Sequence, residues 1–126
     1  MNRTNISGTS PYEPIVGFSR AVRVGNIIHV AGTAPVGAED LSAYEQTRTV
    51  LDLIGKALTQ AGATENPFAH VVRTRTYITH TDDWQEIGRA HGEIFSDIRP
   101  AATMVTVKEL LNPRWRVEIE ADAILP

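Results

Sequence analysis

The chain has 126 residues, of which 42% are hydrophobic and 21% are charged, and these values suit a single globular domain with one modest core. The formal net charge is −3 at pH 7, which leaves no basic stripe for phosphates and argues against nucleic-acid binding. The chain contains no cysteine, so disulfides, thiolate catalysis and cysteine-bound metals are excluded.

The first residues of the chain are rich in Thr, Ser and Asn and contain no long apolar run. We interpret residues 1–14 as a flexible N-terminal segment and residues 15–126 as one domain. Because no signal peptide or membrane span is recognisable, we expect a cytoplasmic protein without a membrane partner.

Two β-rich runs, residues 16–24 and 27–33, are separated by Gly25 and Asn26. This pair suits the positive φ angles of a tight turn, so the pattern predicts an N-terminal β-hairpin.

A helix is predicted for residues 42–61. Ser42 and Glu45 have the spacing of a capping box, and Gly62 stands where a left-handed C-terminal cap belongs. Between them, apolar or small side chains recur at helical spacing, which indicates one buried stripe: Thr47, Leu51, Ile54, Leu58 and Ala61.

Residues 71–79 alternate and therefore predict a strand with two different faces. We place four residues toward the core, Val72, Thr74, Thr76 and Ile78, and four on the opposite face, Val71, Arg73, Arg75 and Tyr77. A second helix follows over residues 82–97, with Thr81 or Asp82 as its cap. Its apolar stripe is Trp84, Ile87, His91, Ile94 and Phe95.

Two last strands are predicted at residues 101–109 and 116–125, joined by a turn at Asn112 and Pro113. The predicted order is β-β-α-β-α-β-β, an α+β fold with a mixed sheet and two helices on one face. The opposite face combines bulky and charged side chains, which suggests a partner subunit: Arg73, Arg75, Tyr77, Met104, Glu118 and Glu120.

Four segments carry a family resemblance: VGFSRAV at 16–22, GNIIHVAG at 25–32, PAATMV at 100–105 and VEIEA at 117–121. They resemble GPYSQAV, SGQ, PARS-x-V and VEIEA of the RidA/YjgF family, and the resemblance covers about residues 15 to 125. It implies a chorismate-mutase-like subunit in a homotrimer with a central barrel, and small-molecule ligands in three intersubunit clefts. The deaminases of that family hydrolyse enamines or imines, and the resemblance implies neither a cofactor nor a metal.

The sequence departs from the family pattern at the residues that bind substrate. The arginine that grips the substrate carboxylate falls on Ala102, which cannot make a bidentate charge-assisted contact. A tyrosine falls on Phe18, a frequent asparagine on Gly88 and the serine of SGQ on Ala31. The residues that carry over are Gly32, Thr33, Thr103 and Glu120.

The candidate site combines these positions with nearby polar side chains. We assign Glu120 as the catalytic carboxylate that orients water, with an intersubunit ion pair as the alternative. Glu118 and Met104 are placed in the pocket. Arg75 is the preferred substitute for the missing arginine, and a paired salt-bridge network is its competing interpretation.

His91 is interpreted either as a general acid or base, or as a hydrogen-bonded packing residue. The other histidines, His29, His70 and His80, show no metal-ligand spacing, and we predict no metal site.

Three functions are compatible with the sequence. The first is a RidA-like enzyme that adds water to a C=N or enamine carbon of a substrate other than a simple 2-imino acid. The second is a non-catalytic trimeric module that binds a small metabolite. The third, a ribonuclease or translation inhibitor, has little support in an acidic chain without a suitable His pair.

Overall fold

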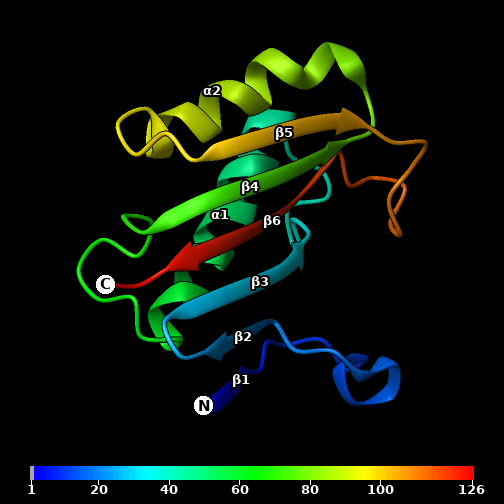
Figure 1. The fold of residues 1–126 in the computed structure, drawn as a ribbon. Helices are drawn as coiled ribbons and strands as arrows, with labels where there is room; N and C mark the ends of the chain where they lie inside the picture. The colour runs from blue at the N-terminus through cyan, green and yellow to red at the C-terminus, as the bar shows by residue number, and fades with distance from the viewer. Residues whose placement is uncertain (1) are drawn as a thin grey trace.

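The computed structural model describes residues 2–126, and its strands form one six-stranded sheet in the order β1-β2-β3-β6-β4-β5 (Figure 1). Neighbouring strands are antiparallel except for β4 and β5, which are parallel. The strand bounds are Arg3–Ile6 (β1), Ala21–Val24 (β2), Ile27–Thr33 (β3), Val71–Ile78 (β4), Ala101–Thr106 (β5) and Val117–Ile124 (β6).

Two helices, α1 (Ala43–Gln60) and α2 (Trp84–Phe95), cover one face of this sheet, and the other face carries no helix (Figure 1). The predicted α+β class, with two helices on one face of a mixed sheet, is confirmed. None of the helices described over residues 2–126 is long and apolar enough to cross a membrane.

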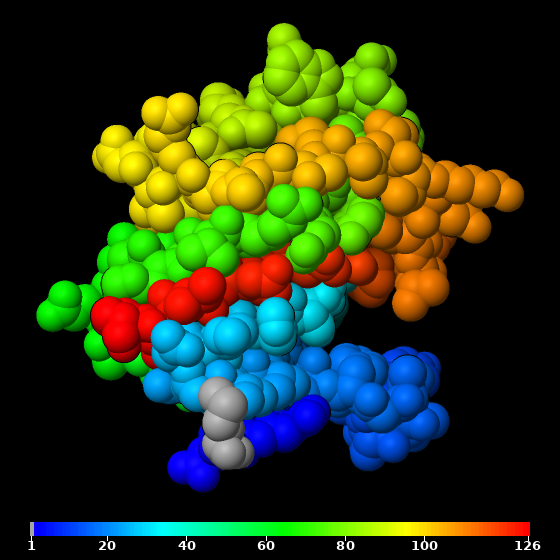
Figure 2. All heavy atoms as spheres, viewed as in Figure 1, coloured from blue at the N-terminus to red at the C-terminus, as the bar shows by residue number. Residues whose placement is uncertain are grey.

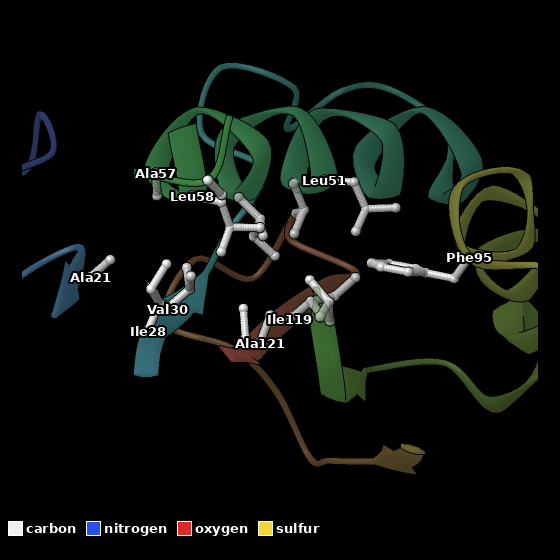
Figure 3. Close-up of a cluster of buried hydrophobic side chains, with 14 of the residues drawn as sticks. Ala21, Ile28, Val30, Leu51, Ala57, Leu58, Phe95, Ile119 and Ala121 are labelled. Atoms are coloured by element: carbon white, nitrogen blue, oxygen red, sulfur yellow. The ribbon is translucent and has the colours of Figure 1, made fainter. Parts of the chain in front are cut away.

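The hydrophobic core lies between the helices and the sheet. In Figure 3, Leu51 and Leu58 of α1 point toward Ile28 of β3 and Ile119 of β6, and Phe95 approaches from α2. All five side chains are buried. Strand β6 presents an apolar face to the helices, because Val117, Ile119, Ala121 and Ala123 are all buried.

The N-terminal region differs from the sequence interpretation. Instead of a flexible segment, Arg3–Ile6 forms strand β1, which pairs with β2, while Met1 lies outside the described residues. Residues 16–18, expected in a strand, belong to or follow a π-helical turn, η1 (Glu13–Gly17). Pro14 favours the start of this turn. Gly17 ends it at φ +91°, a conformation that residues with a Cβ atom disfavour.

The start of α1 agrees with the sequence prediction, because the Ser42 hydroxyl accepts a hydrogen bond from the Glu45 amide at 3.1 Å. The start of α2 differs from the prediction that Thr81 or Asp82 caps it. A 3-10 turn, η2 (Thr81–Asp83), precedes it, and no side chain caps the helix. The Asp83 carboxylate instead accepts two hydrogen bonds from Arg116, at 2.8 and 3.0 Å.

A bulge at the beginning of β4 changes which valine enters the core. The pairing of β4 with β6 shifts register between Val71 and Arg73. Val71 is consequently buried at 3% exposure, and Val72, which we expected in the core, is 43% exposed. From Arg73 onward the predicted alternation holds, with Thr74, Thr76 and Ile78 buried.

Gln46 of α1 joins the helix to two loops at one end of the sheet. Its side-chain amide donates to the carbonyls of Glu39, Leu41 and Arg114, and its oxygen accepts from the Arg116 amide at 2.7 Å. Gln46 is fully buried. These backbone groups therefore depend on one side chain for their hydrogen bonds.

Replacing Gln46 with leucine should lower the free energy of unfolding by about 2 kcal/mol or more, because several buried backbone groups lose their partners. Denaturant titration measures this change. The matched control is Gln60→Leu on the exposed side of the same helix, where a change within about 0.5 kcal/mol is expected. Equal stability of the two variants would contradict the role of Gln46.

Candidate functional site

The uncovered face of the sheet, here called the open face, carries a row of polar side chains. Residues paired directly across neighbouring strands share a face, and the register pairs Arg75 with Glu120 and Tyr77 with Glu118. On the other side of β4, Arg75 pairs with Thr103 of β5. Figure 2 looks onto this face, where β3, β6, β4 and β5 lie side by side without a covering helix.

Ion pairs and hydrogen bonds connect the open-face side chains. Nη1 of Arg75 lies 3.3 Å from Oε1 of Glu120 and 3.1 Å from Oδ2 of Asp122. The Tyr77 hydroxyl donates to the same Glu120 oxygen at 3.2 Å. At the other end, Nδ1 of His29 lies 2.6 Å from Oδ1 of Asp122.

The expectation that Arg75 and Glu120 share one face is confirmed by this contact. Within residues 2–126, the hydrogen bonds of Arg75 use only Nη1, and the side chain is 38% exposed. Arg75 is therefore paired with carboxylates without being enclosed. Its partners raise the pKa of the guanidinium, chiefly through the hydrogen bond with Asp122.

A second cluster on the open face surrounds Glu118. A Cβ atom at Gly32 would lie 2.6 Å from Oε2 of Glu118, so the carboxylate rests directly on the glycine backbone of β3. Nη2 of Arg20 donates to the Gly32 carbonyl. Nε of Arg20 is buried and has no hydrogen-bond partner among the described residues. Glu118 thus lies against the Gly32 backbone and near an incompletely satisfied cation.

The two glutamates differ in environment. Burial raises the pKa of Glu118, Arg20 opposes this shift, and the neighbouring Glu120 adds to it. Glu120 is held by Arg75 and Tyr77. A carboxyl with a raised pKa exchanges protons nearer neutral pH. Burial thus raises the pKa of Glu118, whereas Glu120, which we assigned as the catalytic carboxylate, forms an ion pair with Arg75 and a hydrogen bond with Tyr77.

Ala102 and Met104 lie on the helix-covered side of β5. The register pairs Ala102 with Thr74 and Met104 with Thr76, and both threonines are buried beneath the helices. The placement of Met104 on the open face is therefore wrong. Thr103, between them, does face the open side, where it accepts a hydrogen bond from Nη2 of Arg73 at 3.2 Å.

His91 and Gly88 of α2 belong to this helix side. Nε2 of His91 lies 2.9 Å from Oγ1 of Thr74, and burial lowers the pKa of the imidazole. A Cβ at Gly88 would meet no atom within 4 Å. Trp84, which we expected on the buried stripe, is 54% exposed.

The predicted site residues therefore form two groups, which we call the open-face group and the helix-side group. Two of the predicted residues belong to neither group: Thr33 is a buried residue of β3, and Phe18 follows η1 two positions before Arg20. The open-face group contains Gly32, Arg75, Thr103, Glu118 and Glu120; the helix-side group contains Gly88, His91, Ala102 and Met104. Within one chain, a six-stranded sheet separates them.

Two depressions of the surface lie away from both groups. One, of about 480 Å³, is lined by residues that include Arg23 and Gly62, and the other, of about 290 Å³, is lined by residues that include His80 and Arg116.

Residues 2–126 hold no cluster of three acidic or histidine side chains that could bind a metal ion.

The candidate site residues did not include Arg20, Tyr77 or Asp122, although the strand pattern had placed Tyr77 on the open face. Arg20 carried a visible signal, because it stands where GPYSQAV has glutamine. Tyr77 and Asp122 carried only the period-two alternation of their strands, which gives the face but not the contacts.

A family model described as endoribonuclease L-PSP matches residues 8–125, nearly the whole chain. The chain belongs to the RidA/YjgF family. A crystal structure of a member of the YjgF/YER057c/UK114 family from Mycobacterium tuberculosis is 47% identical, with a TM-score of 0.90, and the match covers 98% of this chain and 100% of that one.

Two further relatives extend the comparison. A RutC family protein of Pyrococcus abyssi is 34% identical, over 89% of this chain and 87% of that protein. A 2-iminobutanoate/2-iminopropanoate deaminase of Dermatophagoides farinae is 26% identical, over 90% of this chain and 89% of that protein. RidA/YjgF membership therefore holds along the full domain.

The raised pKa of Glu118 predicts a pH dependence of stability. Above the ordinary glutamate value of about 4.5, the unfolded chain loses this proton while the folded chain retains it, so the free energy of unfolding falls as pH rises. Glu118→Gln should remove this fall, and Glu120→Gln should retain most of it. Denaturant titrations from acidic to neutral pH measure the difference, and identical profiles for wild type and Glu118→Gln would contradict it.

Proposed function

We propose that the chain forms a homotrimer in which the open-face group of one subunit and the helix-side group of a neighbour build each ligand cleft. The argument comes from the sheet: a small molecule cannot touch Glu118 and Ala102 of the same chain, because they lie on opposite faces. Two copies can bring them together. The exposed edge strand β5 and the charged open face supply unpaired surface for such an assembly.

The proposed reaction is hydrolysis of an imine or enamine. An enamine first becomes an imine, as a proton moves from its nitrogen to its β-carbon. Water then adds its oxygen to the carbon of the C=N bond while a proton goes to nitrogen. The resulting carbinolamine passes its hydroxyl proton to nitrogen and expels ammonia, which leaves a carbonyl. Glu118 suits the transfer of the proton from water to nitrogen, since burial raises its pKa. The single observation that carries the proposal is this desolvated carboxylate against the Gly32 backbone.

Ala102 narrows the choice of substrate. Each hydrogen bond between a guanidinium and a carboxylate is worth about 1.5 to 3 kcal/mol, and Ala102 makes none. Arg75 reaches such a cleft only from the neighbouring subunit, and there it is already paired with Glu120 and Asp122. The proposed substrate is therefore an imine or enamine other than a simple 2-imino acid.

Ala102 also favours a second function, that of a binding module without catalysis. In this case Glu118 would hold a ligand without transferring protons. An endoribonuclease activity has support only in the name of the matching family. The net charge of −3 argues against an RNA substrate.

Ammonia release tests the proposed reaction. Freshly generated neutral imines should be hydrolysed, and 2-iminopropanoate should be hydrolysed far more slowly. Glu118→Gln should reduce turnover by about 100-fold or more, the usual contribution of a positioned acid or base. Glu120→Gln should cause a much smaller loss. If no imine is hydrolysed above the uncatalysed rate, the binding module is the correct function.

The composite cleft predicts an obligate oligomer. Light scattering at micromolar concentration should report a trimer. When Glu118→Gln subunits are refolded together with Ala102→Trp subunits, which block the helix-side group, part of the activity should return, because some mixed clefts contain neither substitution. A monomer, or mixed trimers with no more activity than the separate variants, would contradict the two-subunit site.

A further inference from the structure

The imidazole of His91 has one nitrogen fixed and one available. Nε2 is held 2.9 Å from the hydroxyl of the buried Thr74. Nδ1 has no hydrogen-bond partner within residues 2–126, and it is not among their buried unpartnered nitrogens, so solvent reaches it. The ring also packs on Phe95, with ring centroids 4.6 Å apart. The orientation of Nδ1 is thus set by contacts on two sides of the ring.

His91 lies beside the position of the missing arginine. Ala102 pairs with Thr74, the residue that holds His91. Paired residues on adjacent strands are about 5 Å apart, so a long side chain at position 102 would extend past the imidazole. Alanine leaves this region open, and His91 is the polar side chain next to it.

The surroundings of His91 offer room and apolar surface. A methyl group at Gly88 or Gly92, on either side of His91 along α2, would meet no atom within 4 Å. Trp84 lies one turn before Gly88 on the same helical face and is 54% exposed. Met104, on the helix side of β5, is 37% exposed. These features suit the apolar body of a small molecule.

Among the described residues, the helix-side group contains no lysine or arginine that could take the place of the missing arginine. Burial alone lowers the pKa of His91, so its ring is neutral at neutral pH. Arg89 of the same helix is committed elsewhere, since it bonds to Glu86 at 2.8 Å and stacks on Tyr44. The helix-side group therefore offers a neutral hydrogen bond, which a carboxylate uses poorly in a partly buried site.

We propose that His91 is a specificity-determining residue that binds an uncharged carbonyl, amide or imine group through Nδ1. The space at Gly88 and Gly92 and the exposed side chains of Met104 and Trp84 receive an apolar or aromatic substituent. The ligand class is a neutral carbonyl or imine compound with such a substituent. This inference rests on the proposed function, because it deepens the choice of ligand for the same cleft.

Phenylacetamide and phenylacetate are the probes, since they share a shape and differ in charge. Each is titrated into the wild-type oligomer at neutral pH while ¹H–¹⁵N spectra record the histidine rings. Phenylacetamide should shift the His91 ring signals saturably, and phenylacetate should bind about tenfold more weakly. His80, which lines a surface depression away from both groups, serves as an internal reference. Equal binding of the two probes, or no response of His91, would overturn the inference.

Two variants complete the test, with light scattering and circular dichroism to verify assembly and fold. His91→Phe keeps the packing on Phe95 but removes Nδ1, and it should abolish the preference for the amide. Ala102→Arg should reverse the preference in favour of phenylacetate. An unchanged preference in either folded variant would refute the role of His91.

The binding readout separates this inference from the proposed reaction. If the amide preference depends on His91 but no imine is hydrolysed, only the proposed reaction fails. If imines are hydrolysed and His91→Phe changes neither their KM nor amide binding, only the role of His91 fails.

Discussion

The pairing of β4 with β6 at the centre of the sheet is the constraint on which the remaining structure depends. Its register places Thr74, Thr76, Ile119 and Ala121 beneath the two helices. Because side chains alternate along a strand, the same register forces the intervening arginines and glutamates onto the open face. A slip of one residue would bury these charges in the core. The burial of the apolar side chains therefore also keeps the arginines and glutamates on the open face.

On the open face, some charged side chains are paired, and others keep hydrogen-bond donors without partners. Arg75 is shared by Glu120 and Asp122, whereas Arg20 and Arg73 each keep a buried Nε without a partner among the described residues. An unpaired buried donor costs free energy, and a ligand or a second subunit could supply its missing bond. The Glu118 carboxylate, partly desolvated beside Gly32, belongs to the same incompletely satisfied region.

The helix-side group has the opposite character. Ala102, Gly88 and Gly92 are small, and the polar group beside them, His91, is neutral because burial opposes its protonation. One side of the sheet therefore carries paired and partly desolvated charges, and the other offers a neutral hydrogen bond and space. A cleft built from both sides would place the reactive carboxylate and the specificity-determining imidazole on different subunits.

The sequence by itself determined the elements from residue 21 onward, the helix-covered side of the sheet and the family. These depend on local periodicity, on caps such as Ser42, and on contiguous motifs such as VEIEA. Strand β1 could not be predicted because polar residues 3–5 show no apolar alternation, and because the connection to its partner β2 contains the η1 turn and no hairpin signal. Only the tertiary structure decided which of Val71 and Val72 enters the core, that burial raises the pKa of Glu118, and on which face Met104 lies. Each of these depends on a bulge, a register or a close approach between strands, and periodicity within one segment contains no information about its neighbours.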